Sequence, residues 1–168
     1  KYVFISSACI FESKNLKDIK YEDSKPNPQC FYALSKWLAE ELILEANPDT
    51  LIVRPRLPLS EVPHPRNTIN KLLTYNKIST NQESVTVVED FIPSLVQLIE
   101  KGQNGIVNMV NAGTISPAEI AELLGHKFKK VSKKSQDKRL AEERRAKRVS
   151  TYVGSRRIPL LPDIRERI

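Results

Sequence analysis

The sequence predicts an α/β protein built around a parallel sheet. Short apolar runs rich in β-branched residues alternate along the chain with longer segments that repeat apolar side chains every three or four residues. The chain has 168 residues, of which about 40% are apolar, and this is enough for one globular domain with its own core. No apolar run approaches the ~20 residues that a membrane span requires, so the sequence predicts no contact with a membrane.

The first three elements are expected in the order strand, helix, strand. Residues 1–6 contain a continuous apolar run, which is typical of a buried parallel strand. Segment 31–46 predicts an amphipathic helix, which ends at an Asn-Pro pair. Its periodic apolar residues are Leu34, Trp37, Leu38 and Leu42. Residues 50–53 form a second apolar run before Pro55, and this order is typical of a crossover between parallel strands.

The same alternation continues towards the C-terminus. Ser116, Pro117 and Glu119 have the spacing of a capping box, which predicts a helix that ends near Gly125. The other expected elements are helices at 66–75, 91–99 and 136–147, strands at 85–88 and 105–110, and an extended tail at 158–162.

The positive charge of the chain is local. The formal net charge is +7, but residues 127–148 hold eleven Lys or Arg against three acidic residues, or +8, and the rest of the chain is near −1. Aromatic residues are nearly absent from this basic segment, so a solvated charged face is the favoured interpretation, and binding of nucleic acid or an acidic partner is the alternative. The two cysteines and two isolated histidines predict neither a disulfide scaffold nor a metal site, and a reducing cytoplasmic location fits best.

One helical pair of residues has the chemistry of a proton donor. Tyr32 and Lys36 lie four positions apart on one helix face, where the ammonium can help the phenol to exchange a proton with a carbonyl oxygen. A second pair, Tyr21 and Lys25, lies in a polar segment next to a proline, where we expect no helix. Only the first pair follows a strand end, and ligands of open α/β sheets bind at such ends.

These residues resemble a known family. Ser7, Tyr32 and Lys36 are similar to the Ser/Thr, Tyr and Lys triad of extended short-chain dehydrogenases/reductases that act on nucleotide sugars. More narrowly, five runs resemble the bifunctional 3,5-epimerase/4-reductases of rhamnose synthesis, in the same order. They are residues 8–12, 31–36, 53–60, 65–71 and 105–108.

The resemblance implies the C-terminal part of a Rossmann-like reductase with a small substrate-binding lobe. Residues 1–110 would form part of the NAD(P)-binding domain, and residues 111–168 the substrate-side lobe with the basic segment. Tyr32 would donate a proton to the C4 alkoxide of a UDP- or dTDP-linked 4-keto-6-deoxyhexose. Lys36 would hold the nicotinamide ribose of NADPH or NADH, and Ser7 would bond the ketone oxygen.

The resemblance also implies an acid/base pair that inverts C3 and C5 of the sugar. Cys9 and Lys71 are similar to that pair, although a cysteine can equally be a packed apolar residue and a lysine an ordinary solvated one. Leu57 and Pro58 are candidates for the cofactor wall. Arg66 and Asn67 are candidates for substrate contact, or they simply start a helix. We expect Cys30, Glu89 and Asp90 to be structural.

The sequence lacks one feature that such an enzyme needs. Its five glycines cannot form the glycine-rich turn that holds the pyrophosphate of a dinucleotide, so we expect an N-terminal nucleotide-binding portion to lie outside this chain. The alternative is a non-catalytic, reductase-like binding or regulatory module. A second copy of the chain, in a homodimer, is a further candidate partner.

Overall fold

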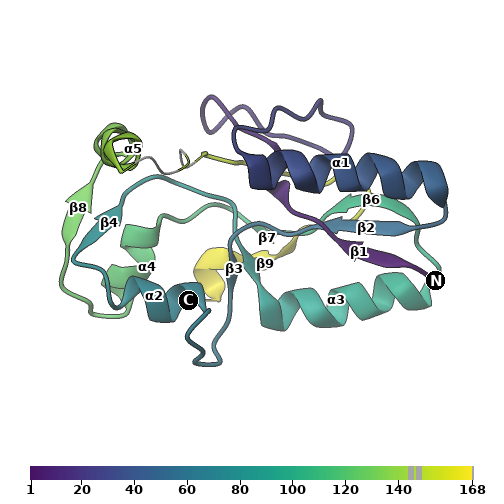
Figure 1. Cartoon of the computed structure of the whole chain (residues 1–168). Coiled ribbons are helices and arrows are strands. Elements are labelled where there is room, and N and C mark those ends of the chain that lie inside the picture. The colour runs from purple at the N-terminus through teal and green to yellow at the C-terminus, as the bar shows by residue number, and fades with distance from the viewer. Residues whose placement is uncertain (144–145, 147–148, 168) are drawn as a thin grey trace.

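A parallel three-stranded sheet forms the centre of the larger part of the molecule. The computed structural model describes residues 1–143, 146 and 149–167. Strands β1 (Val3–Ile5), β2 (Leu51–Arg54) and β6 (Gly105–Asn108) lie in the order β1-β2-β6, and both strand pairs are parallel. Helices α1 (Phe31–Ala46) and α3 (Val88–Glu100) lie on opposite sides of this sheet (Figure 1). The predicted parallel α/β class is therefore confirmed.

A buried apolar layer joins the sheet to α3. It is formed by side chains of β2, α3, β6 and the C-terminal segment, and its buried members are Leu51, Val53, Phe91, Leu98, Val107, Met109 and Leu161. The strand β2 is buried at all four positions because strands flank it on both sides and helices cover both faces.

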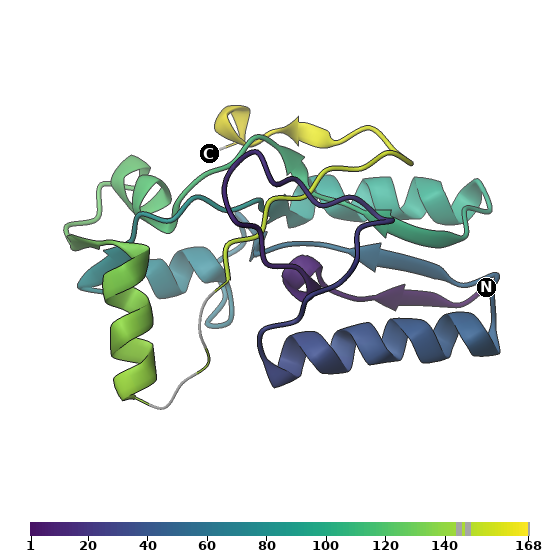
Figure 2. The same ribbon diagram turned by 90° about the horizontal axis from the view of Figure 1, so that it is seen from above.

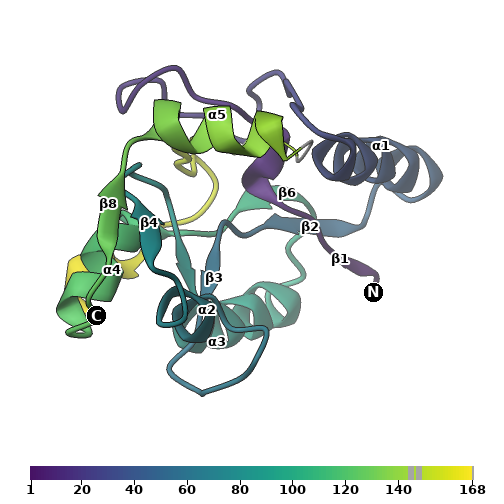
Figure 3. The same cartoon turned by 60° about the vertical axis from the view of Figure 1, so that its left-hand side comes forward.

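A smaller lobe lies beyond the carboxyl ends of the three strands. It contains three short parallel ladders and the helices α2 (Thr68–Leu72), α4 (Pro117–Leu123) and α5 (Lys133–Glu142) (Figure 3). The ladders are β3 (Pro58–Leu59) with β5 (Thr86–Val87), β4 (Lys77–Ser79) with β8 (Lys129–Val131), and β7 (Asn111–Ala112) with β9 (Leu161–Asp163). A second apolar cluster holds this lobe together, and it includes Leu72, Ile78 and Ile120.

The C-terminal segment returns to the start of the chain. Residues 149–154 lie beside the loop that follows the short 3-10 helix η1 (Ala8–Ile10), as Figure 2 shows. Backbone hydrogen bonds join the two segments: Ser13 N–H donates to Ser150 O at 2.8 Å, and Lys20 N–H donates to Tyr152 O at 2.8 Å. A last 3-10 helix, η2 (Ile164–Glu166), buries Ile164 in the smaller lobe. Within the described residues, no helix is long and apolar enough to cross a bilayer.

The helix α1 has the predicted bounds but buries a different face. Leu34, Leu38 and Leu42, which gave the helical periodicity, are 37%, 48% and 71% exposed, so they do not form its buried face. The side that faces the sheet contains buried Ala33 and Glu40 with half-buried Trp37. Apolar periodicity identified the helix correctly, but it could not show that a buried carboxylate marks the inner face.

Several other boundaries differ from the expected ones. The helix expected at 66–75 is only five residues long, and the strand expected at 85–88 ends at Val87 because α3 begins at Val88. The strands β3, β4, β7 and β8 were not predicted, since two- or three-residue strands leave little periodic signal. The charged helix begins at Lys133, three residues before the expected start, and part of its expected end lies outside the described residues.

The capping box of α4 gives a direct test of the fold. The Ser116 hydroxyl accepts from Glu119 N–H at 3.1 Å, and the Glu119 carboxylate accepts from Ser116 N–H at 2.7 Å. Ser116→Ala should lower the free energy of unfolding by about 1 kcal/mol, because it leaves a helix N–H without its partner. Urea unfolding followed by circular dichroism measures the change. Ser35→Ala on the exposed side of α1 is the control, and an equal loss in both variants would contradict the capping role.

Candidate functional site

The candidate site begins where β1 ends. The backbone of residues 6–8 continues alongside β2, with Ser6 N–H donating to Val53 O at 2.8 Å and Ala8 N–H donating to Pro55 O at 3.0 Å. Ser7 caps η1, and its hydroxyl accepts from Cys9 N–H at 3.2 Å. Ser7 is buried and Cys9 is half-buried. The two residues therefore lie at the carboxyl end of the sheet, the edge at which parallel α/β sheets bind ligands.

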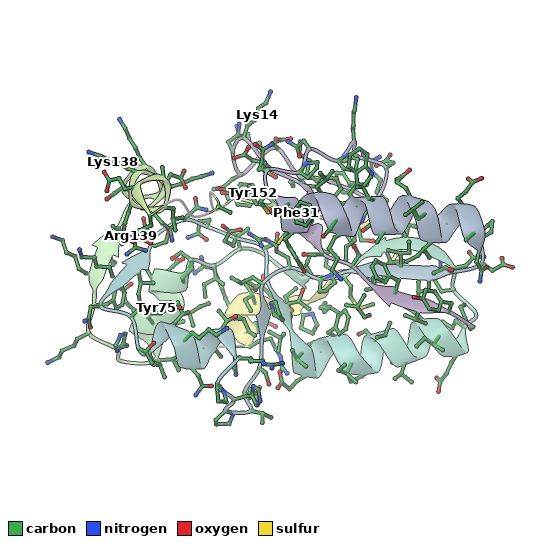
Figure 4. The ribbon with its side chains drawn as sticks, in the orientation of Figure 1. Lys14, Phe31, Tyr75, Lys138, Arg139 and Tyr152 are labelled. Carbon is green, nitrogen blue, oxygen red and sulfur yellow. The ribbon has the colours of Figure 1, made fainter. Side chains whose placement is uncertain are left out.

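Lys36 joins α1 to the end of β1. Its ammonium donates to Ile5 O at 3.1 Å and lies 4.8 Å from the centre of the Phe4 ring. Tyr32 lies one turn earlier on the same helix and is 53% exposed. In the part of the chain that the structure describes, the Tyr32 phenol has no hydrogen-bond partner, so it is available to a ligand. Figure 4 shows the neighbouring Phe31 at this end of α1.

A buried ion pair fixes α1 against the sheet. Glu40 of α1 and Arg54 of β2 are both almost fully buried, and the two carboxylate oxygens accept from Arg54 Nε at 3.0 and 3.1 Å and from Nη2 at 2.5 Å. The Ser6 hydroxyl also donates to the Glu40 carboxylate. Arg54 in turn donates to Glu22 O at 3.3 Å. The pair therefore links α1, the helix that carries Tyr32 and Lys36, to the central strand β2 and to the end of β1.

A second buried arginine reaches the cysteine. Arg56 Nη1 donates to Cys9 Sγ at 3.0 Å, and Arg56 Nη2 donates to Glu83 Oε2 at 2.7 Å. Burial acts to lower the pKa of the Arg56 guanidinium, but Glu83 and Cys9 raise it overall, so the arginine stays charged. Burial raises the pKa of Glu83, and hydrogen bonds from Arg56, Thr151 and Asn81 oppose that effect.

The cofactor-wall candidates follow directly after Arg56. Leu57 has a φ of +39°, a region that non-glycine residues rarely occupy. This conformation turns the chain so that exposed Pro58 starts the short strand β3. Leu57 itself packs against the apolar cluster of the smaller lobe. The bend thus carries the chain from the end of β2 into that lobe.

The remaining candidates lie around α2, in the smaller lobe. Asn67 caps this helix, and its amide nitrogen donates to Ser60 O at 2.6 Å and to Val62 O at 3.0 Å, so the side chain is occupied with local structure. Arg66 is exposed. Lys71 is exposed on α2, and among the described residues its ammonium has no polar partner. No direct contact joins Lys71 to Cys9 in this part of the chain.

The acidic pair at the start of α3 holds loops. Glu89 accepts from the Ser60 hydroxyl at 2.6 Å and from Glu61 N–H at 3.0 Å. Burial opposes ionisation of Glu89, but these hydrogen bonds outweigh it and lower its pKa. Asp90 accepts from Asn111 at 2.8 Å and forms an ion pair with Arg167 at 3.0 Å. Both residues thus hold neighbouring segments at the start of α3.

Sequence reasoning missed the four charged groups that organise the site. Glu40, Arg54, Arg56 and Glu83 were given no role, although Glu40 lies on the same face of the expected helix as Trp37, three positions earlier. Glu83 carried no such signal, because the fold alone brings its loop to Arg56, 27 positions away in the sequence.

The family follows from comparison with known proteins. A family model described as the RmlD substrate binding domain matches residues 1–148. The chain belongs to this family. The expected resemblance to extended short-chain dehydrogenases/reductases of rhamnose synthesis is thereby confirmed.

The relatives are longer proteins. The Arabidopsis thaliana bifunctional dTDP-4-dehydrorhamnose 3,5-epimerase/dTDP-4-dehydrorhamnose reductase is 30% identical over 125 residues, which are 70% of this chain and 41% of the relative. An Arabidopsis trifunctional UDP-glucose 4,6-dehydratase/UDP-4-keto-6-deoxy-D-glucose 3,5-epimerase/UDP-4-keto-L-rhamnose-reductase is 31% identical over 125 residues, or 70% and 18%. The chain thus spans less than half the length of these two relatives.

Solved structures share the fold. The L780 UDP-rhamnose synthase of Acanthamoeba polyphaga mimivirus matches with a TM-score of 0.74 and 25% identity, covering 90% of this chain and 55% of that one. The dTDP-4-dehydrorhamnose reductase of Bacillus anthracis, solved in complex with NADP, matches with a TM-score of 0.75 and 20% identity, covering 99% and 62%. Together with the family match and the Arabidopsis relatives, this makes the chain homologous to reductases and epimerases of rhamnose synthesis.

The ion pair that fixes α1 should be a large contributor to stability. Glu40→Ala would leave the Arg54 guanidinium buried without its countercharge, and we expect the free energy of unfolding to fall by about 3–5 kcal/mol. Lys130→Ala, which removes an exposed pair with Glu122, is the control and should cost less than about 1 kcal/mol. Urea unfolding measures both. Losses of equal size would show that the buried pair does not anchor the helix.

Proposed function

We propose that this chain supplies the proton-transfer and substrate side of an enzyme that epimerises a nucleotide-linked 4-keto-6-deoxyhexose at C3 and C5 and reduces it at C4 to a rhamnose sugar nucleotide. The observation that carries the proposal is the contact of Lys36 Nζ with Ile5 O at the end of β1, two residues before Ser7, with the exposed Tyr32 phenol one turn earlier on the same helix. Membership of the RmlD family and homology to such enzymes support it.

The residues present fit the nicotinamide end of a dinucleotide. Lys36 uses one of its three donors on Ile5 O, which leaves two for a ribose hydroxyl. The bend at Leu57 and the exposed Pro58 offer a wall beside the strand end. The first glycine of the chain is Gly102, so the turn that would hold the pyrophosphate must come from a portion outside these residues. We propose that residues 1–110 form mainly the cofactor side and residues 111–168 mainly the substrate side, with α2 and its neighbouring short strands adding to the substrate side from within residues 1–110.

In the reduction, the chain's own residues handle the proton. NADPH, or NADH, would supply the hydride to the C4 ketone. The Tyr32 phenol would donate a proton to the oxygen as it gains charge, and the Ser7 hydroxyl would donate a hydrogen bond to the same oxygen. Lys36 would favour the ionised phenol that results, and the backbone contact to Ile5 O keeps its ammonium at the strand end.

The epimerisation needs two groups on opposite faces of the sugar ring. Cys9 lies in η1 beside the triad, whereas Lys71 lies on α2 in the smaller lobe. A sugar held between the sheet edge and this lobe would have one group on each side. Arg66, at the entrance to α2, is a candidate for contact with the substrate phosphates, and Asn67 would act there by holding the loop.

A non-catalytic role is the second candidate. It applies if the full polypeptide that carries these residues lacks a glycine-rich nucleotide-binding turn. A reductase-like subunit that binds the sugar nucleotide without reducing it would retain the same fold. This role predicts substrate binding with no NADPH oxidation, even when a nucleotide-binding portion is present.

The reductase role is tested by Tyr32→Phe in a longer polypeptide that carries these residues together with a glycine-rich nucleotide-binding turn. The change removes the proton donor but little of the ring, so kcat for NADPH oxidation with the 4-keto sugar should fall by about 100-fold or more while KM changes little. Lys36→Ala should act in the same direction. Tyr75→Phe, which changes an exposed tyrosine of the smaller lobe (Figure 4), is the control. A near-normal rate in Tyr32→Phe would refute the triad assignment.

The epimerase role predicts a different phenotype for Cys9 and Lys71. In the same longer polypeptide, Cys9→Ala or Lys71→Ala should abolish deuterium incorporation from D₂O at C3 or C5, as measured by NMR or mass spectrometry. Reduction of an already epimerised 4-keto sugar should remain, because Tyr32 and Lys36 are unchanged. Cys30→Ala and Lys101→Ala are the controls. Incorporation at both carbons in the Cys9→Ala, Lys71→Ala double variant would exclude this acid/base pair.

A further inference from the structure

We propose that Arg56, anchored by Glu83, is a positioning residue that controls the reactivity of the Cys9 sulfur. The inference deepens the proposed function, since it concerns the cysteine assigned to epimerisation, but it can be tested on the sulfur itself without a sugar. Arg56 Nη1 donates to Cys9 Sγ at 3.0 Å. The arginine is only 9% exposed, so this contact is largely shielded from water.

Glu83 determines where the guanidinium points. Arg56 Nη2 donates to Glu83 Oε2 at 2.7 Å, and the carboxylate is itself held by Asn81 at 2.9 Å and by Thr151 N–H at 3.2 Å. A guanidinium is a rigid planar fork, so the direction of Nη2 also fixes the direction of Nη1. One cation thus bridges a carboxylate and a sulfur.

The backbone restricts the arginine further. Arg56 N–H donates to Thr86 Oγ1 at 3.0 Å, and Arg56 Nη2 also donates to Val149 O at 3.1 Å. The sulfur is held from its own side, because the Ser7 hydroxyl caps the turn that carries Cys9. Neither partner of the N–H···S contact is a free surface side chain, so the contact belongs to the folded site.

The positive charge of Arg56 is shared between Cys9 and Glu83, and this affects the reactivity of the sulfur. A thiolate, not a thiol, is the nucleophile and the base, and a neighbouring cation favours it. Glu83 competes with the sulfur for the single positive charge of Arg56. Loss of the Arg56 charge should therefore make Cys9 less reactive. Loss of the Glu83 charge should make it more reactive, provided that the replacement still accepts the hydrogen bond from Nη2.

The experiment measures alkylation of Cys9 by iodoacetamide at pH 7 in the 168-residue chain. The sulfur displaces iodide and forms an S–C bond, and peptide mass spectrometry gives separate rates for Cys9 and Cys30. Cys9 should react about tenfold more slowly in Arg56→Gln, which keeps a polar side chain but no charge. It should react about threefold faster in Glu83→Gln. Arg56→Lys, which keeps the charge but loses the fork, should lie between Arg56→Gln and the unchanged chain.

The opposite signs separate this account from a general loosening of the fold. A loosened site would expose both cysteines, so Cys9 and Cys30 would accelerate together in every variant. If Arg56→Gln left the Cys9 rate within twofold of the original, or if both glutamine variants moved it in one direction, the positioning role would be refuted. Failure of the deuterium-incorporation test with these alkylation rates intact would instead count against the epimerase function alone.

Discussion

The geometry of the site depends on the buried ion pair between Glu40 and Arg54. Without it, α1 would contact the sheet mainly through small or half-buried side chains such as Ala33 and Trp37, while its leucines remain on the outer side. Two charges removed from water are stable only when their hydrogen bonds are complete, and here Arg54 and Ser6 supply them. The pair therefore fixes both the rotation and the position of the helix that carries Tyr32 and Lys36.

The tripeptide Arg54-Pro55-Arg56 organises the site from the end of β2. Its first arginine binds a carboxylate of α1, and its second binds a carboxylate from the loop that precedes β5. Pro55 O also accepts the N–H that starts η1. One short segment thus positions the helix with the phenol, the turn with the cysteine and the bend into the smaller lobe. Both guanidinium groups are buried, and each is paired with a carboxylate, as the burial of a charge requires.

The sequence was sufficient for the parts of the fold that have strong periodic or capping signals. The bounds of α1 and the capping box at Ser116 were predicted correctly, and so was the parallel crossover from β1 through α1 to β2. The short strands β4 and β8 were missed because they exist only through their pairing with each other, about fifty positions apart. The buried face of α1 was not predicted, because its Glu40 is paired with Arg54, a residue that only the fold brings near.

The candidate site was likewise predictable from the sequence only in part. Ser7, Tyr32 and Lys36 could be selected from sequence because their spacing and their place after a strand have a chemical meaning. Arg56 and Glu83 could not be linked, since nothing in their own segments indicates that they share one guanidinium contact with Cys9. The action of these residues on a sugar is a prediction.

The central claim is that the end of β1 holds the C4 oxygen of a sugar nucleotide. The most direct measurement is a crystal structure, with NADP⁺ and UDP-rhamnose, of a longer polypeptide that carries these residues together with a glycine-rich nucleotide-binding turn. The account predicts that the C4 hydroxyl lies within hydrogen-bond distance of both Tyr32 Oη and Ser7 Oγ, with Lys36 Nζ on the nicotinamide ribose. A sugar whose C4 lies away from these groups would contradict it.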